Sequence, residues 1–339
     1  AMIETPQALP EKQAAAGSGG VDLLSHLLGS MHLSGMVTFR AEFSEPWGVS
    51  TPGTRNLARA LPFRTEHIIP FHVLAQGGCW LELKDRAPVW LEDGDAVLMP
   101  YGDSHLLHGR QDASPVPLGQ LLPPPPWSDM PVIRYGGSGP GTKLICGFVQ
   151  CDELLIHPFL RHLPALMHVS PGKKENAWLA ATIRHTAYEA THSQPGAHSM
   201  LGRLTELMFV EILREHMRSL SNHELGWFAA ASDPVVGAAL KCLHTSPFDA
   251  WSIERLTRSV GVSRTVLSER FNALLGQPPM QYLACWRLQL AAQRLKSTDA
   301  PMKTVADQAG YESEAAFSRA FKRLYGLPPS DWRKQQTLR

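Results

Sequence analysis

The sequence predicts an α+β multidomain protein, with an N-terminal β-barrel, a helical segment in the middle and an all-α C-terminal domain that contains two helix-turn-helix units. Three observations carry this prediction. A turn-and-cap pattern is repeated near the C-terminus, short apolar strands separated by glycine fill the N-terminal part, and between them the apolar spacing changes to the helical period. The expected parts are a flexible tail over residues 1–20, the barrel over 21–152, the helical segment over 153–225, a linker over 226–234 and the C-terminal domain over 235–339.

The C-terminal repeat relates two stretches at a constant offset of 50 residues. Ser263 corresponds to Ser313, and Gly276 corresponds to Gly326. In each copy the serine can cap a helix, the glycine can end it, and a Pro-Pro pair directly beyond prevents its continuation. Between the copies we expect one long amphipathic helix, on which Arg287 faces solvent. The side chains expected on the inner faces are Val266, Leu267, Phe271 and Leu274 in the first copy and Ala316, Phe317, Phe321 and Leu324 in the second.

Two helix-turn-helix units on one face of a domain are typical of DNA recognition, because each second helix can enter a major groove when the two lie roughly 34 Å apart. The charge distribution agrees with this interpretation. The whole chain has a net charge of +1, but from Asp233 onward it has 15 Lys and Arg against 9 Asp and Glu. The alternative is an all-helical interaction domain with a solvated basic face. The residues expected to contact DNA are Arg264, Thr265, Ser268, Glu269, Arg270, Ser313, Glu314, Ala315, Ser318, Arg319, Lys322 and Arg323.

Residues 233–333 resemble the DNA-binding domain of the AraC/XylS family of bacterial transcription regulators. The motifs that carry the resemblance are Trp-Ser-Ile-Glu-Arg-Leu at 251–256, Ala-Asp-Gln-Ala-Gly-Tyr-Glu-Ser at 306–313, Phe-Ser-Arg-Ala-Phe-Lys at 317–322 and Tyr-Gly-Leu-Pro-Pro-Ser at 325–330. The resemblance implies recognition helices over residues 264–275 and 314–325. Glu269 departs from the polar or basic residue often found at its position in the family.

The N-terminal part shows the pattern of short strands. Residues 36–43 alternate as a half-buried strand does, and residues 68–74 and 79–83 are β-rich runs. The Gln76-Gly77-Gly78 turn between these two runs favours a hairpin. Residues 110–142 contain a run of four prolines and a glycine-rich stretch, and they are expected to be an irregular loop.

Residues 94–105 resemble the second cupin motif, with glycine, proline, glycine and His105 in the expected register. The longer stretch from residue 71 to residue 105 resembles the cupin-type sensor domain of one branch of the same regulator family. A barrel of that size can hold one small ligand, so the resemblance implies a small-molecule effector. The residues expected to bind it are His72, Leu74, Cys79, Trp80 and His105.

His72 and His105 are expected to point inward and to meet. As alternatives, the pair could ligate a transition metal such as zinc or could simply be hydrogen-bonded inside the barrel. The usual ligand set of cupin enzymes is missing from the first motif, which argues against a cupin enzyme.

Cysteine offers another alternative, because some regulators of this branch sense oxidants through cysteine. The five cysteines follow no disulfide pattern, and we expect a reducing cytoplasm. Cys146 and Cys151 lie on one predicted strand and face opposite sides, while Cys79 could approach either. Redox sensing through these three residues and plain burial of free cysteine both stay open.

The helical segment contains a broadly apolar helix over residues 201–213. In related regulators such a helix pairs with its symmetry mate, so a homodimer on two half-sites is expected, and packing of the helix on the barrel is the alternative. Residues 229–232 are expected to be a hinge, followed by Asp233 as a helix cap. The expected partners are double-stranded DNA, a second copy, a small-molecule effector and, for an activator, RNA polymerase, with no membrane.

Overall fold

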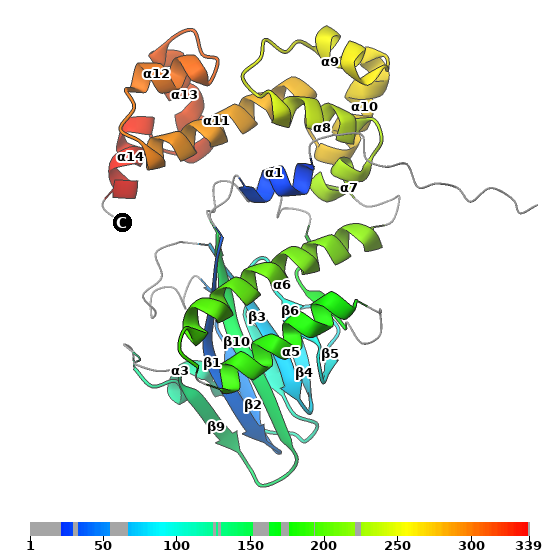
Figure 1. Ribbon diagram of the computed structural model, residues 1–339, viewed down its shortest axis with the longest axis vertical. Helices are drawn as coiled ribbons and strands as arrows, with labels where there is room; N and C mark the ends of the chain where they lie inside the picture. Colours follow the sequence, from blue (N-terminus) through cyan, green and yellow to red (C-terminus); the bar gives the residue numbers. More distant parts are fainter. Residues whose placement is uncertain are drawn as a thin grey trace, which may run out of the picture.

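The computed structural model describes residues 22–29, 33–54, 67–124, 127, 130–151, 163–170, 176–192, 194–220 and 225–337, without the side chains of residues 37, 67, 151, 336 and 337. The predicted tail over residues 1–20 lies outside the described residues. The predicted α+β class is confirmed, with a β-rich N-terminal part that carries helices on one face and an all-helical C-terminal part (Figure 1).

Two β-sheets face each other in the N-terminal part. The six-stranded sheet has the order β11 (Met167–Val169), β6 (Ala96–Leu98), β3 (His67–Gln76), β10 (Gly141–Cys151), β1 (Ser34–Ser44) and β9 (Val132–Gly136). The five-stranded sheet has the order β5 (Val89–Glu92), β4 (Gly78–Leu83), β7 (His105–His108), β2 (Gly48–Thr51) and β8 (Val116–Pro117). Apolar side chains from both sheets form one core between them.

The two central strands illustrate how the sequence pattern sets the packing. Phe39 and Phe43 of β1 alternate with polar residues and point into the core between the sheets. The middle of strand β3 is buried on both faces, so its residues there are apolar except for the buried His72. Phe71 and Val73 pack toward the helices, whereas Leu74 faces the core between the sheets.

The turn at residues 76–78 is not the predicted hairpin, because β3 and β4 belong to different sheets. The chain crosses between the sheets at Gly77, whose φ is +88° and where an added β-carbon would lie 2.5 Å from the Gly141 carbonyl oxygen. The irregular loop predicted over residues 110–142 is also partly wrong. It contains β8, a short helix α3 (Leu118–Leu121) and β9, which pairs in parallel with β1 and buries Ile133.

Helices α5 (Ala177–Thr191) and α6 (Ala197–Ser219) cover the outer face of the six-stranded sheet (Figure 1). Helix α6 approaches β1 unusually closely, because glycines meet there. An added β-carbon at Gly35 would lie 2.5 Å from the Gly202 carbonyl oxygen, and one at Gly202 would lie 2.9 Å from the Gly35 carbonyl oxygen. Neither position can accept a larger side chain without moving the helix.

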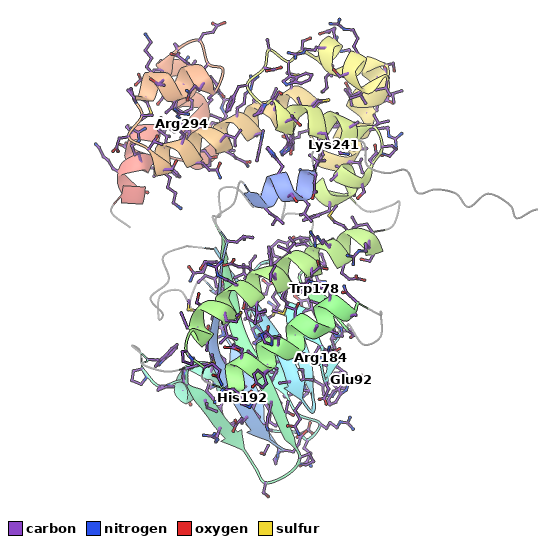
Figure 2. The ribbon with its side chains drawn as sticks, in the orientation of Figure 1. Glu92, Trp178, Arg184, His192, Lys241 and Arg294 are labelled. Carbon is purple, nitrogen blue, oxygen red and sulfur yellow. The ribbon has the colours of Figure 1, made fainter. Side chains whose placement is uncertain are left out.

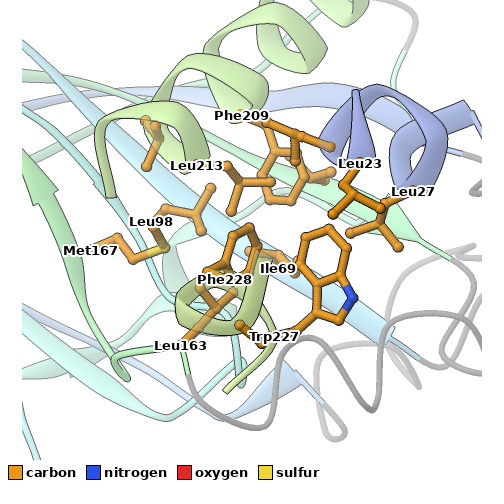
Figure 3. Close-up of a cluster of buried hydrophobic side chains, with 14 of the residues drawn as sticks. Leu23, Leu27, Ile69, Leu98, Leu163, Met167, Phe209, Leu213, Trp227 and Phe228 are labelled. Carbon is orange, nitrogen blue, oxygen red and sulfur yellow. The ribbon is translucent and has the colours of Figure 1, made fainter. Parts of the chain in front are cut away.

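The predicted linker over residues 226–234 and its hinge at 229–232 are wrong. This segment contains α7 (Trp227–Ser232), in which Trp227 and Phe228 are buried. They pack with Leu23 and Leu27 of α1 (Leu23–Gly29) (Figure 3). The same apolar cluster contains core residues of the N-terminal part and of the C-terminal part. The small residues suggested flexibility, but the aromatic pair in front of them anchors the helix.

The C-terminal part consists of α8 (Val236–Thr245), α9 (Ile253–Val260), α10 (Arg264–Leu275), α11 (Pro279–Ser297), α12 (Met302–Gln308), α13 (Glu314–Tyr325) and α14 (Pro329–Thr337). The predicted inner faces are confirmed for Leu267 and Phe317, which are fully buried. Val266 and Leu324 were predicted to lie inside but are 41% and 42% exposed. Arg287 was predicted to face solvent but is half-buried and bonded to backbone carbonyls.

Candidate functional site

The two helix-turn-helix units begin and end their second helices in the same way. The Ser263 hydroxyl accepts a hydrogen bond from the Val266 N–H at 3.2 Å, and the Ser313 hydroxyl accepts one from the Ala316 N–H at 3.2 Å. Gly276 and the equivalent Gly326 adopt the left-handed conformation that ends each helix. The predicted caps and stops are therefore confirmed in both copies.

Every residue predicted to contact DNA lies on the surface of α10 or α13 or at its N-cap. Ser268 and Ser318 are half-buried at corresponding positions, and the others are exposed. Leu267 and Phe317, which directly precede these two serines, are buried in the two cores. One face of each helix is therefore held by packing while the opposite face is open to a ligand.

Two of the basic residues already have partners in the fold. Arg270 forms an ion pair with Asp233, and the same carboxylate accepts hydrogen bonds from the N–H groups of Val235 and Val236. Arg264 lies 3.7 Å from Glu254, but both side chains are largely exposed, so this pair is weak. Arg270 therefore helps to hold the start of α8, and its contact with phosphate stays a prediction.

A second candidate site lies between the two sheets. His72 on β3 and His105 on β7 bring their Nε2 atoms to 2.9 Å, as predicted from their inward direction. The other ring nitrogen of His72, Nδ1, lies 3.0 Å from the Cys146 sulfur on β10. His105 Nδ1 lies 3.2 Å from the Asp103 carbonyl oxygen. Buried side chains from three strands thus form one hydrogen-bonded chain.

The donor and acceptor of each hydrogen bond in this series follow from the last acceptor, the Asp103 carbonyl oxygen. A carbonyl oxygen only accepts, so His105 Nδ1 carries a proton and donates it to Asp103. Burial lowers the pKa of His105 to about 4, and burial together with His105 lowers the pKa of His72 well below its usual value, so both rings are neutral near pH 7. His105 Nε2 then accepts from His72 Nε2, and His72 Nδ1 accepts from the Cys146 thiol.

The other residues predicted to bind an effector divide between the two faces of the sheets. Leu74 and Cys79 lie in the core between the sheets, in the same cluster as Cys146. Trp80 does not belong to this site, because β4 alternates and turns Trp80 outward, where it contacts Trp90 at 5.2 Å between ring centroids. The side chain of Cys151 lies outside the described residues.

Cys146 is the partner of His72 that the sequence interpretation missed, because their contact depends on the pairing of β3 with β10. Burial raises the pKa of Cys146 well above its usual value and raises that of Cys79 to about 12, so both are thiols. The two histidines would supply only two metal ligands, whereas zinc sites use three or four protein ligands. Within the part of the chain that the structure describes, no group of three or more His, Cys, Asp or Glu side chains is arranged to hold a metal ion. The site therefore does not fit zinc.

Comparisons with known proteins agree with both parts of the chain. Residues 22–218 match a cupin family model, and residues 256–335 match a helix-turn-helix domain. A putative AraC-like transcription regulator from Streptomyces lividans is 32% identical over 82% of this chain and 91% of its own length. The chain belongs to the AraC-like transcription regulators. It is therefore a DNA-binding regulator and not an enzyme.

This AraC-like regulator is also similar to a second curated relative and to a solved DNA-binding domain. The RCS-specific HTH-type transcriptional activator RclR from Escherichia coli is 25% identical over 79% of this chain and 85% of its own length. The solved DNA-binding domain of AdpA, in complex with a target DNA, is 27% identical and covers 32% of this chain and 96% of that chain, with a TM-score of 0.29. In the described ranges of this AraC-like regulator, no helix is both long enough and apolar enough to cross a membrane.

Proposed function

We propose that this AraC-like regulator is a homodimeric transcription activator that reads two successive major grooves with α10 and α13 and is controlled by a small molecule bound in the cupin domain. RclR is described as an activator, which supports this direction of control. For an activator, the proposed protein partner is RNA polymerase. Because the target is chromosomal DNA, the proposed place of action is the bacterial cytoplasm.

The observation that carries the DNA-reading proposal is the equivalence of α10 and α13. Each begins at a serine cap, buries one aromatic-bearing face and exposes polar and basic residues on the other. Arg319 on α13 is exposed, and a guanidinium there can form two hydrogen bonds with guanine.

Replacing Arg319 by alanine tests this role. We expect Arg319→Ala to weaken specific binding by about 1–3 kcal/mol and to relax one base position in sequences selected from random DNA. The matched control is Lys241→Ala, which removes an exposed positive charge from α8 (Figure 2). Equal losses for Arg319→Ala on specific and random DNA would assign it to a phosphate contact instead.

The proposed dimer surface lies on the open side of α5 and α6. Trp178 and Tyr188 of α5 are 58% and 50% exposed, and Met200 and Leu207 of α6 are 45% and 46% exposed. Met200 and Leu207 are seven residues apart and so lie on one side of their helix, and α5 packs beside α6 (Figure 2). Large apolar side chains gathered on neighbouring helices are typical of an interface, and the proposed occupant is the same surface of a second copy.

Light scattering on the purified protein tests the dimer. We expect Leu207→Glu to shift the mass from dimer to monomer, because it would bury two charges at the symmetric contact. Leu225→Glu, at a leucine outside these helices that is 57% exposed, should leave the mass unchanged. A wild-type monomer, or a Leu207→Glu dimer, would contradict the proposed interface.

The proposed effector site contains His72, His105, Leu74 and Cys79. It is supported by a neutral hydrogen-bonded chain in an otherwise apolar core, because such a chain can exchange donors and acceptors with a polar ligand at little electrostatic cost. Native mass spectrometry of protein purified from bacterial cytosol should show a bound organic mass that His105→Gln loses and His198→Gln, at an exposed histidine, retains. Wild-type protein that stays free of ligand even after incubation with cytosolic extract would contradict it.

Oxidant sensing is the second candidate for the signal. It is favoured by the contact between Cys146 and a histidine base. It is opposed by the raised pKa values of both core cysteines, since the thiolate is the reactive form. If DNA affinity changes with peroxide, the change should disappear in Cys146→Ser and persist in Cys242→Ser. An unchanged response in Cys146→Ser would exclude this route.

A further inference from the structure

We propose that Arg287, together with Gly310, fixes the separation and rotation of the two helix-turn-helix units and thereby selects the spacing between the two DNA boxes that this regulator accepts. The proposal rests on the proposed reading of two successive grooves. It makes Arg287 a positioning residue that touches no DNA.

Arg287 holds a loop of the first unit. It projects from α11, and its Nε donates to the Pro247 carbonyl oxygen at 2.6 Å while its Nη2 donates to the Asp249 carbonyl oxygen at 2.6 Å. Residues 246–252 connect α8 to α9, so this loop belongs to the first unit. Asp249 is held further by Arg255, whose Nη2 donates to its carboxylate at 2.7 Å. The guanidinium is therefore hydrogen-bonded to a loop that is itself held in place by Arg255.

The same guanidinium lies against the turn of the second unit. An added β-carbon at Gly310 would lie 2.9 Å from Arg287 Nη1, so a larger residue there would push against this guanidinium. Gly310 has a φ of +79° and its N–H donates to the Asp307 carbonyl oxygen, which places it at the turn between α12 and α13. One rigid planar group thus contacts both units.

The position of Arg287 on α11 coincides with the boundary between two cores. Trp286 belongs to the apolar cluster that contains the first unit, and Leu288 belongs to the separate cluster of the second unit. Beside this boundary lies a groove of about 540 Å³. It is lined by Phe248 of the loop between α8 and α9 and by Val305 and Gln308 of α12. Where the two units are not packed together, a bridge such as Arg287 has the greatest influence on their relative orientation.

The environment of Arg287 agrees with a role inside the domain. The side chain is half-buried, and burial lowers the pKa of its guanidinium from the usual value. Both of its hydrogen bonds go to uncharged carbonyls, which are oriented acceptors for a planar fork. A lysine would keep the charge but could not reproduce this geometry.

The consequence for DNA follows from helical geometry. Each recognition helix moves with its own unit, so a rotation of the units about α11 changes the phase between α10 and α13. A change of one base pair in the spacer rotates one groove by roughly 34° relative to the other. A stiff joint should therefore tolerate one spacing, whereas a loose joint should tolerate several.

The test is selection of binding sites from a pool of random duplex DNA by the full-length protein. Wild-type protein should select two boxes at one spacing and lose about tenfold or more in affinity when one base pair is added or removed, which corresponds to a DNA deformation cost of at least 1.4 kcal/mol. Arg287→Ala should select the same boxes with a spread of spacings. Arg294→Ala, which removes an exposed guanidinium from the same helix, should behave as wild type (Figure 2).

Arg287→Lys is the milder variant in case Arg287→Ala does not fold, since lysine keeps the charge and the aliphatic stem. It should broaden the range of selected spacings to an intermediate degree. Thermal melting confirms which variants are folded. A folded Arg287→Ala or Arg287→Lys variant with the wild-type spacing would overturn the proposal. Selection of a single box by the wild-type protein would instead overturn the two-groove reading itself, and this proposal with it.

Discussion

At the residue scale, buried histidines show how packing decides charge. His72, His105 and His244 are all nearly inaccessible to water. His244 in the C-terminal part accepts from the Tyr282 hydroxyl, which in turn accepts from the Trp227 indole N–H at 2.9 Å. Burial lowers the pKa of His244 to about 3. The same physical cause keeps all three rings neutral in two separate cores.

This burial predicts acid lability. The unfolded histidines take up protons below about pH 6.5, whereas folded His105 and His244 resist protonation down to about pH 4 and 3, so the unfolded state binds more protons and stability falls as pH decreases. Each such group contributes a slope of about 1.4 kcal/mol per pH unit between these limits. Melting temperatures measured from pH 7 to pH 5 should fall steeply, and His105→Gln should flatten the curve, unlike His198→Gln. A curve equally steep in His105→Gln would contradict the assignment.

Residues also show where sequence interpretation succeeds and fails. The meeting of His72 and His105 could be predicted, because strand parity and a motif place both inward. Trp80 was assigned to the same site although it stands one residue from Cys79 and so faces the other side of β4. Val266 and Arg287 were misplaced because a helix face alone does not tell what neighbouring segments cover it.

At the element scale, the short signals at helix ends were the most reliable. Serine caps and left-handed glycines are local, so both copies of the helix-turn-helix unit could be predicted without knowledge of the tertiary fold. Strand pairing depends on distant segments. The turn at residues 76–78 was therefore interpreted as a hairpin, although the chain passes from one sheet to the other there.

The cap of α13 gives a prediction at this scale. We expect Ser313→Ala to lower the stability of the second unit by about 1 kcal/mol, because the Ala316 N–H loses its acceptor. Ser313→Asp should retain most of the stability, since aspartate is also a good cap. Thermal unfolding and DNA affinity measure the effect, and equal losses in both variants would show that the hydroxyl acts elsewhere.

The crossing of α6 over β1 gives a second prediction at the element scale. Gly202→Val should destabilise the N-terminal part by roughly 1–3 kcal/mol, because the added side chain forces α6 away from the Gly35 backbone. Gly119→Ala is the control, since an added β-carbon meets no atom within 4 Å there. Denaturant unfolding compares the two. A Gly202→Val protein with wild-type stability would show that the helix can shift without cost.

At the scale of the whole molecule, the boundaries of the cores do not follow the predicted domains. One apolar cluster joins the six-stranded sheet, its covering helices, α1 and the first helix-turn-helix unit. The His26 ring of α1 lies 5.7 Å from the His244 ring, between centroids, so α1 contacts the C-terminal part directly. The second unit has a cluster of its own. Composition could not predict this division, because it depends on which apolar faces meet in space.

This division predicts two unfolding transitions in calorimetry of the full-length protein. The larger belongs to the N-terminal part with the first unit, and the smaller belongs to the second unit. Leu27→Ala should lower only the larger transition and Phe321→Ala only the smaller, each by about 2–5 kcal/mol, because both side chains are almost fully buried but in different clusters. If one transition moved equally with either variant, the two units would unfold together and α11 would transmit stability across the Arg287 boundary. Separate shifts would mean that a structural change in the N-terminal part reaches the first unit through shared packing and the second only through α11.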